Sequence, residues 1–256
     1  MGGEEMGGGV LKFGLRKHDR GLEFVIGFCF PPRRVFSYLA IHQPNRTMLT
    51  AERKTTRRSH STQAVPQALI YEILDGQPMY YRGYRDALAG KKSIEEIMGP
   101  SGLQSFIIQY ILDILFTKIG RKQYHFLTNE LGTHLGLKDN LSGDVCIYER
   151  QKLPPEKIDT RYVDIPPKVA VEVDVKVDLS EDKAADYVFR KTQKLLEWGV
   201  EKVIWIFTKT QKVTVAETGK DWLTMDWHRD IELLDGQRFN IGAYLAEEGV
   251  TIDPTA

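Results

Sequence analysis

The sequence predicts a mixed α/β fold in which helices flank one sheet, and three observations lead to this prediction. Residues 101–119 carry apolar side chains at helical spacing, and residues 181–198 form a second helical segment. The run VIWIF at 203–207 is apolar on both faces, as expected for a central strand covered on both sides. Hydrophobic residues make up 42% and charged residues 27% of the chain, which excludes a disordered, collagen-like or membrane-spanning protein.

The first elements of the predicted domain are a hairpin and a long helix. Two strand-like runs in LIYEILDGQPMYY flank Asp75-Gly76, a pair that favours tight turns with positive φ. Ser101 is a candidate N-cap for the helix, and Gly120 stops it as the residue after its C-terminus. The apolar stripe of this helix consists of residues 103, 106, 107, 110, 111, 114, 115 and 119.

Strands dominate the next part. Short strands are predicted at 123–128 and at 144–149, followed by a Pro-containing loop at 150–165. The segment KVAVEVDVKV (168–177) alternates without a break, which predicts one strand with all its valines on one face: Val169, Val171, Val173, Val175 and Val177.

A helix and two strands complete the predicted order. Ser180 caps a helix over 181–198, which ends at Gly199, and the central strand 203–207 follows. Residues 212–216 alternate as an edge strand would. The order of hairpin, helix, strands, helix and two strands places all of these elements around one mixed sheet.

Charge divides the chain into two predicted parts. Residues 1–65 hold 11 Lys/Arg against five Asp/Glu, whereas the remainder holds 24 against 30. We therefore expect a basic N-terminal extension over 1–65, in which Met48 is an alternative start, and a folded domain over 66–256. Two cysteines are too few for a disulfide framework, and no membrane-spanning segment is evident. The expectation is a cytoplasmic protein.

The strand over 168–177 carries the residues with chemical potential. Glu172, Asp174 and Lys176 alternate with valines and so share one face. A polar outer face of a half-exposed strand would explain them, but helices on both sides of the sheet favour burial, and buried charges must be paired, bind metal or line a cleft. Asp144, at the start of the predicted strand 144–149, would complete a site for a hard cation such as Mg²⁺.

These residues resemble the core motif of the PD-(D/E)XK nuclease superfamily, here Asp144 and Glu172-Val173-Asp174-Val175-Lys176. More specifically, residues from about 66 to 217 resemble the restriction endonuclease family of the Uma type. Five pieces match in order, and four of them, besides the long apolar helix, can be quoted: Glu72-Ile73-Leu74-Asp75-Gly76, Asp144, Ala170-Val171-Glu172-Val173, and Lys191 with Leu195, Gly199-Val200 and Trp205.

The resemblance implies a restriction-endonuclease-like mixed sheet and a metal-dependent phosphodiesterase that acts on DNA, often as a homodimer. Asp144 and Glu172 would hold Mg²⁺ or Mn²⁺, Glu72 would add a carboxylate, and a lysine would activate or position the attacking water. Asp174 is either a further metal ligand or the partner of Lys176. Gly143 replaces the family's proline, and Gln104 lies where the family often has histidine.

Two lysines compete for the catalytic role. Lys176 satisfies the superfamily spacing, whereas Lys191 satisfies the Uma-type position on the following helix and is slightly preferred. The resulting hypothesis is a Mg²⁺- or Mn²⁺-dependent DNA endonuclease. The alternative is a catalytically inactive protein of the same fold that binds nucleic acid or a protein partner, which the acidic balance of residues 66–256 favours.

Overall fold

The computed structural model describes residues 12–18, 21–27 and 65–252. The chain divides into two compact units, 1–60 and 61–256. Within the first unit, β1 (Lys12–His18) and β2 (Gly21–Gly27) form an antiparallel hairpin. The rest of the basic segment predicted over 1–65 lies outside the described residues, so its character as an extension stays a prediction.

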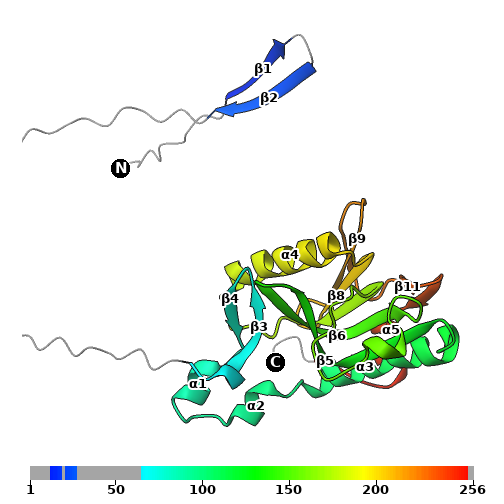
Figure 1. The fold of residues 1–256 in the computed structure, drawn as a ribbon. Helices are drawn as coiled ribbons and strands as arrows, with labels where there is room; N and C mark the ends of the chain where they lie inside the picture. The colour runs from blue at the N-terminus through cyan, green and yellow to red at the C-terminus, as the bar shows by residue number, and fades with distance from the viewer. Residues whose placement is uncertain (1–11, 19–20, 28–64, 253–256) are drawn as a thin grey trace, which may run out of the picture. The chain divides into compact units, whose positions relative to one another are not determined.

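The second unit is a mixed α/β structure around an eight-stranded sheet, which confirms the predicted fold class (Figure 1). Its strand order is β10-β9-β8-β7-β6-β3-β4, and β5 pairs with β6. Only β7 and β8 are parallel; the other pairs are antiparallel. Helix α4 (Glu181–Trp198) covers one face, while α3 (Gly102–Ile114) and α5 (Ile241–Glu247) lie on the other.

The predicted hairpin is confirmed. Strands β3 (Ile70–Leu74) and β4 (Gln77–Tyr80) are joined by Asp75 and Gly76, which have φ of 55° and 74°. Positive φ at both positions gives the turn the twist that antiparallel strands require. Two short helices then lead to α3: α1 (Tyr84–Leu88) and α2 (Ile94–Met98), which the sequence did not predict.

Helix α3 begins as predicted, because the Ser101 side chain accepts a hydrogen bond from the Gln104 amide. It continues as a π-helical turn over Leu115–Ile119 and ends at Gly120, whose φ is 80°. Within the described part of the chain, 102–119 is the one helical stretch long and apolar enough to cross a membrane by length and composition alone.

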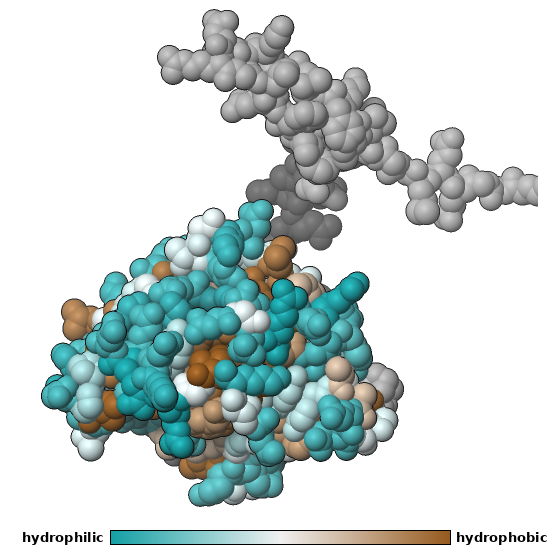
Figure 2. Space-filling model, turned by 90° about the vertical axis from the view of Figure 1, so that its right-hand side faces the viewer, coloured by the Kyte–Doolittle hydropathy of each residue, from teal (hydrophilic) through white to brown (hydrophobic). Residues whose placement is uncertain are grey.

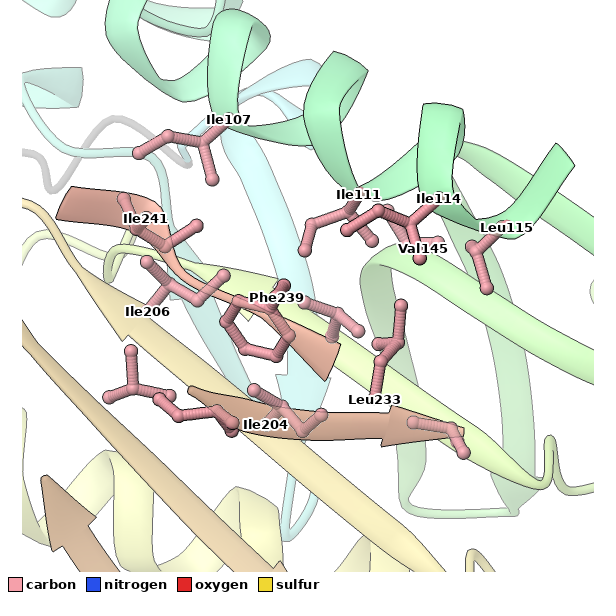
Figure 3. Packing of buried hydrophobic residues seen from close by; sticks show 14 of the residues in the cluster. Ile107, Ile111, Ile114, Leu115, Val145, Ile204, Ile206, Leu233, Phe239 and Ile241 are labelled. Carbon is pink, nitrogen blue, oxygen red and sulfur yellow. The ribbon is translucent and has the colours of Figure 1, made fainter. Parts of the chain in front are cut away.

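The apolar character of α3 is accounted for by core packing. Ile107, Ile111 and Ile114 are buried against strands of the sheet and against the C-terminal segments (Figure 3). The sheet contributes Val145, Ile204 and Ile206 to this core, and the C-terminal part contributes Leu233, Phe239 and Ile241.

Strands β5 (Tyr124–Gly136) and β6 (Asp139–Glu149) are longer than predicted and form one hairpin. Asp144 therefore lies in the middle of a strand and does not open one, so this part of the prediction was wrong. The polar residues Asp139, Asn140, Ser142 and Asp144 obscured the first half of β6 in the sequence. Strand β5 pairs with β6 along this half and satisfies the backbone groups on that side.

The crossover from β7 (Val169–Val173) through α4 to β8 (Lys202–Phe207) forms the predicted βαβ unit. Gly199 ends α4 with φ of 117°, whereas Ser180 is the N-cap residue but makes no side-chain capping bond. Packed beneath α4, a second core includes Ala170, Val203 and Trp205 from the sheet. The central position of β8 confirms the prediction made for VIWIF.

The continuous strand predicted over 168–177 is wrong beyond Val173. Asp174 adopts φ of 61°, and this left-handed residue reverses the alternation of side chains. Val169, Val171 and Val173 pack in the core beneath α3, whereas Val175 and Val177 pack beneath α4.

The C-terminal part extends the sheet further than the sequence predicted. Strand β9 (Lys212–Glu217) is not an edge, because β10 (Leu223–Asp226) pairs with its outer side. A separate hairpin of β11 (Ile231–Leu234) and β12 (Gln237–Phe239) precedes α5. Hydrophilic side chains cover most of the molecular face shown in Figure 2, with hydrophobic ones in small groups.

Candidate active site

The charged residues predicted as a site gather where β6 changes its partner. The first half of β6 pairs with β3 at Asn140, and its second half pairs with β7 from Val145 onward. Between these two ladders, Ser142–Asp144 face a gap in the sheet. Side chains satisfy the backbone groups that strand pairing leaves free there, and this is how carboxylates enter the interior of the sheet.

Asp144 lies in this gap, with its side chain almost fully buried. Its Oδ2 accepts a hydrogen bond from the Val173 amide at 2.8 Å, where a ladder partner would otherwise stand. The Lys176 ammonium lies 2.7 Å from its Oδ1. Asp144 thus links β6 to the end of β7, and its two contacts hold the carboxylate in one orientation.

Glu72 occupies the opposite side of the gap, on β3. The Ser142 amide donates to its Oε2 at 3.1 Å, and the Tyr187 hydroxyl donates to its Oε1 at 2.6 Å. Its side chain is completely buried. Lys191, from α4, lies 3.1 Å from the same Oε2.

Lys191 bridges Glu72 to Glu172. Its Nζ lies 3.2 Å from Glu172 Oε1 and donates to the Ser142 carbonyl at 2.7 Å. Three aromatic rings surround it at 5.6–5.9 Å: Tyr71, Tyr187 and Trp205. The lysine is 0% exposed, so its three donors are used inside the protein.

Burial strongly affects the acid–base properties of this cluster. It raises the pKa of Glu172, Lys191 opposes this effect, and Asp144 and Glu72 add to it, so that together these effects raise the pKa to about 8. Burial alone would lower the pKa of Lys191, but Glu172 and Glu72 reverse this and leave its pKa raised. Glu172 therefore binds a proton more readily than an exposed glutamate does, and a cation bound there would displace that proton.

The second lysine lies at a more open edge. Lys176 Nζ contacts Asp144 and also lies 2.8 Å from Glu130 Oε1, and the Lys176 side chain is 13% exposed. Glu130 accepts a further hydrogen bond from the Tyr81 hydroxyl at 2.9 Å. The pKa of Lys176 is raised, because Asp144 and Glu130 outweigh the opposing effect of burial. This edge connects the buried carboxylates to solvent.

Asp174 does not join the cluster. Its Oδ1 accepts from the Thr208 amide at 2.8 Å and its Oδ2 accepts from the Thr208 hydroxyl at 2.6 Å. The left-handed backbone at Asp174 turns the side chain toward the end of β8, so the shared face predicted for Glu172, Asp174 and Lys176 is wrong. Neither predicted role of Asp174, metal ligand or partner of Lys176, matches these contacts.

The structure adds residues whose place in the site was not predicted. Gln104 Nε2 donates to the Val173 carbonyl at 3.0 Å and to Asp144 Oδ2 at 3.4 Å, so this helix residue spans the gap. Nothing in the sequence indicated Glu130 or Tyr71. Glu130 lies in a bulge of β5, where Asn129 and Glu130 both have positive φ, and Tyr71 resembles any apolar strand residue. At Gly143, a Cβ atom would lie 2.6 Å from Cys146 Sγ, which explains why glycine is required there.

The oxygen atoms around the gap suit a hard divalent cation. Asp144, Glu172, Glu72 and Glu130 supply four carboxyl groups, against two ammonium groups from Lys176 and Lys191. Among the described residues no three His, Cys, Asp or Glu side chains are grouped as ligands. Mg²⁺ commonly uses only one or two carboxylates and retains several waters, and Asp144 and Glu172 are the residues here that could hold such an ion.

No protein-family model matches the chain, and no curated protein matches it. Among solved structures, it is similar to a protein from Anabaena variabilis described as "a putative nuclease belonging to DUF820", with a TM-score of 0.48 and 14% identity. The match covers 68% of this chain and 89% of that one. A likeness of this size carries no argument about activity, which depends on the site itself.

Proposed function

We propose that this chain is a metal-dependent nuclease of restriction-endonuclease-like fold that hydrolyses phosphodiester bonds of DNA. The observation that carries the proposal is the placement of Asp144 and Glu172 beside a split in the sheet, with Lys176 2.7 Å from Asp144 at the solvent edge. Buried carboxylates repel phosphate unless a cation lies between them, and this site holds four carboxyl groups against two ammonium groups.

Asp144 and Glu172 would hold Mg²⁺ or Mn²⁺. Such an ion, when bound, lowers the pKa of a coordinated water and offsets charge that develops on a phosphoryl oxygen. The residues of the chain orient these ligands: the Val173 amide and Gln104 fix Asp144, and Lys191 fixes Glu172. In the reaction, water attacks phosphorus in line, the P–O bond to the leaving sugar oxygen breaks, and that oxygen gains a proton.

We assign the substrate-contacting role to Lys176 and not to the slightly preferred Lys191. Lys191 is 0% exposed and its donors are committed to Glu72, Glu172 and Ser142, so it acts as a positioning residue. Lys176 lies at the accessible edge and can donate to a phosphate oxygen or to the attacking water. A positioned cation at such a site contributes about 10²- to 10³-fold to a rate.

A non-cutting binder of nucleic acid or of a partner protein is the second candidate function. The observation that favours it is the complete pairing of the carboxylates: Asp144 contacts Lys176, and Glu172 contacts Lys191. In that case the charges would stabilise the split in the sheet without participating in chemistry.

Nicking of supercoiled plasmid in Mg²⁺, Mn²⁺ or EDTA separates the two functions. The nuclease proposal predicts metal-dependent nicking that is abolished in Glu172→Gln and reduced about 10²- to 10³-fold in Lys176→Ala. Glu156→Gln, at an exposed carboxylate outside the site, is the matched control and should cut like the wild type. DNA binding without nicking under any condition would establish the binder instead.

A further inference from the structure

A cavity beside the candidate active site has no role in the reaction proposed above. Its volume is about 370 Å³, which is room for a nucleoside-sized group. The β5–β6 hairpin and the loop that follows β6 form its walls. Its lining consists of His134, Asn140, Lys157, Asp159, Arg161, Tyr162 and Asp164.

The most distinctive wall is an aromatic ring lying on a glycine. A Cβ atom on Gly132 would lie 2.6–2.8 Å from three ring carbons of Tyr162, so any other residue at 132 would displace the ring. The neighbouring Val163 pairs with β5, with its amide donating to the Gly132 carbonyl at 3.0 Å. Tyr162 is nevertheless 59% exposed. One face of the ring is thus supported by backbone while much of the side chain is open to solvent.

This ring lies near the open edge of the active site. Gly132, on which the Tyr162 ring lies, is two residues from Glu130 on β5 and pairs with Ser142 of β6. Tyr81 donates to Glu130, and Glu130 contacts Lys176, the lysine assigned to the substrate. The cavity and the edge at which Lys176 lies thus share strand β5, which carries Glu130, Gly132 and the lining residue His134.

The charges and donors of the cavity suit a neutral polar ring better than a phosphate. Arg161 is paired with Asp159 at 2.6 Å, and Lys157 and Asp164 balance one another in sign. His134 Nδ1 lies 2.6 Å from Asn140 Oδ1 and must donate to it, because an amide oxygen only accepts. The Asn140 amide nitrogen and the second imidazole nitrogen of His134 then remain as polar groups for a ligand.

We propose that this cavity binds an unpaired nucleobase adjoining the scissile phosphate, with Tyr162 as the stacking surface and Asn140 and His134 at the edge of the base. The inference rests on the proposed nuclease function and specifies its substrate: a nucleic-acid strand that is single-stranded or locally opened. A base paired within a duplex cannot lay its face on Tyr162. Stacking on an aromatic side chain is tolerant of base identity, so little sequence preference is expected.

Binding of labelled oligonucleotides tests this inference. Fluorescence anisotropy in EDTA, where no strand is cut, gives the Kd of a single-stranded oligonucleotide and of the same sequence as a duplex. Tyr162→Ala should weaken single-strand binding about fivefold to 100-fold. Tyr162→Phe retains the ring and should bind like the wild type. Phe189→Ala, which removes another exposed ring, is the matched control.

The affinity for duplex should remain unchanged in Tyr162→Ala. This control distinguishes the loss of base stacking from a general loss of affinity for nucleic acid. Equal weakening of both strand forms, or no weakening at all, would overturn the proposal. If the wild type nicks plasmid while Tyr162→Ala binds single strands normally, the base-binding cavity fails and the nuclease function stands. If the wild type binds neither strand form in EDTA, the base-binding cavity fails, and plasmid nicking in Mg²⁺ or Mn²⁺ decides the nuclease function separately.

Discussion

The two lysines of the site form contrasting charge clusters. Lys191, with Glu72 and Glu172, is sealed beneath α4 and among three aromatic rings. Lys176, with Asp144 and Glu130, lies at the solvent edge of the same split in the sheet. Tyr71 adjoins both, with its ring centroid 5.6 Å from one ammonium and 5.9 Å from the other. The sealed cluster fixes geometry, whereas the edge cluster is available to a ligand.

This difference shows that two lysine–carboxylate clusters in one site can differ in how much they contribute to stability and in whether a ligand can reach them. Removal of one partner from a sealed ion pair leaves a buried charge without compensation. At a partly exposed edge, water or a ligand can replace the lost partner. We therefore expect substitutions in the Lys191 cluster to affect mainly stability, and substitutions in the Lys176 cluster to affect mainly activity.

The largest expected effect is on stability, in Lys191→Met. The methionine retains most of the volume but leaves Glu72 and Glu172 without their cation, so the free energy of unfolding should fall by about 3–5 kcal/mol. Urea denaturation measures this loss. Lys176→Met is the comparison and should lose less, because Lys176 and Glu130 are partly exposed and the Val173 amide still donates to Asp144. Equal losses in the two variants would remove the distinction between the clusters.

The next effect concerns pH and comes from Glu172. Its pKa of about 8 in the folded protein exceeds the ordinary value of 4.5, so unfolding releases a proton between these limits. This contribution to stability is therefore fully present below about pH 4.5 and is lost as pH rises toward 8. The raised pKa of Lys191 adds no slope in this window, because that lysine stays charged throughout it.

Glu172→Gln should remove the loss of stability that Glu172 causes as pH rises, because glutamine does not titrate. Between pH 5 and pH 8, the wild type should lose about 1–3 kcal/mol more than the variant. The difference between the two proteins is the informative quantity, since surface carboxylates with lowered pKa values, such as Glu149, contribute equally to both. Parallel stability curves would show that Glu172 is ionised in the folded protein at neutral pH.

Much of the framework of this site was predictable from sequence, because it depends on local patterns. The hairpin turn at Asp75-Gly76, the capped helix after Ser101 and the crossover ending at Gly199 all have short-range signals. Their order then places Glu72, Asp144 and Glu172 in one sheet. Lys191 was indicated by the resemblance to the Uma-type family, in which the crossover helix carries a lysine.

The missed features depend on long-range contacts or on a single backbone angle. Gln104 reaches Asp144 from a helix 40 residues earlier in the chain, and no local pattern specifies that contact. The reversal at Asp174 changes one residue from extended to left-handed, yet it moves Val175, Val177 and the Asp174 carboxylate to new surroundings. Alternation of valines alone could not reveal it.

A smaller effect is expected from metal binding. At ten times its Kd, Mg²⁺ or Mn²⁺ should stabilise the wild type by about 1.4 kcal/mol. For a domain of this size the thermal midpoint would rise by about 3–6 °C. Differential scanning fluorimetry with and without the ion measures the shift. Asp144→Asn should remain folded and lose the shift; an unchanged shift in this variant would place the metal elsewhere.

The smallest effect is expected from Asp174→Asn and separates the two acidic residues of the motif. Asparagine tolerates φ near 61° and can still accept the hydrogen bond from the Thr208 amide, so stability should fall by less than about 1 kcal/mol. Nicking should stay within about twofold of wild type, because the Asp174 carboxylate faces Thr208 and not the Asp144 cluster. Asp174→Ala lacks both hydrogen bonds and should be less stable. If Asp174→Asn instead lost nicking as completely as Glu172→Gln while retaining its stability, the carboxylate would have to leave Thr208 during the reaction, and the metal-ligand role predicted from the sequence would be restored.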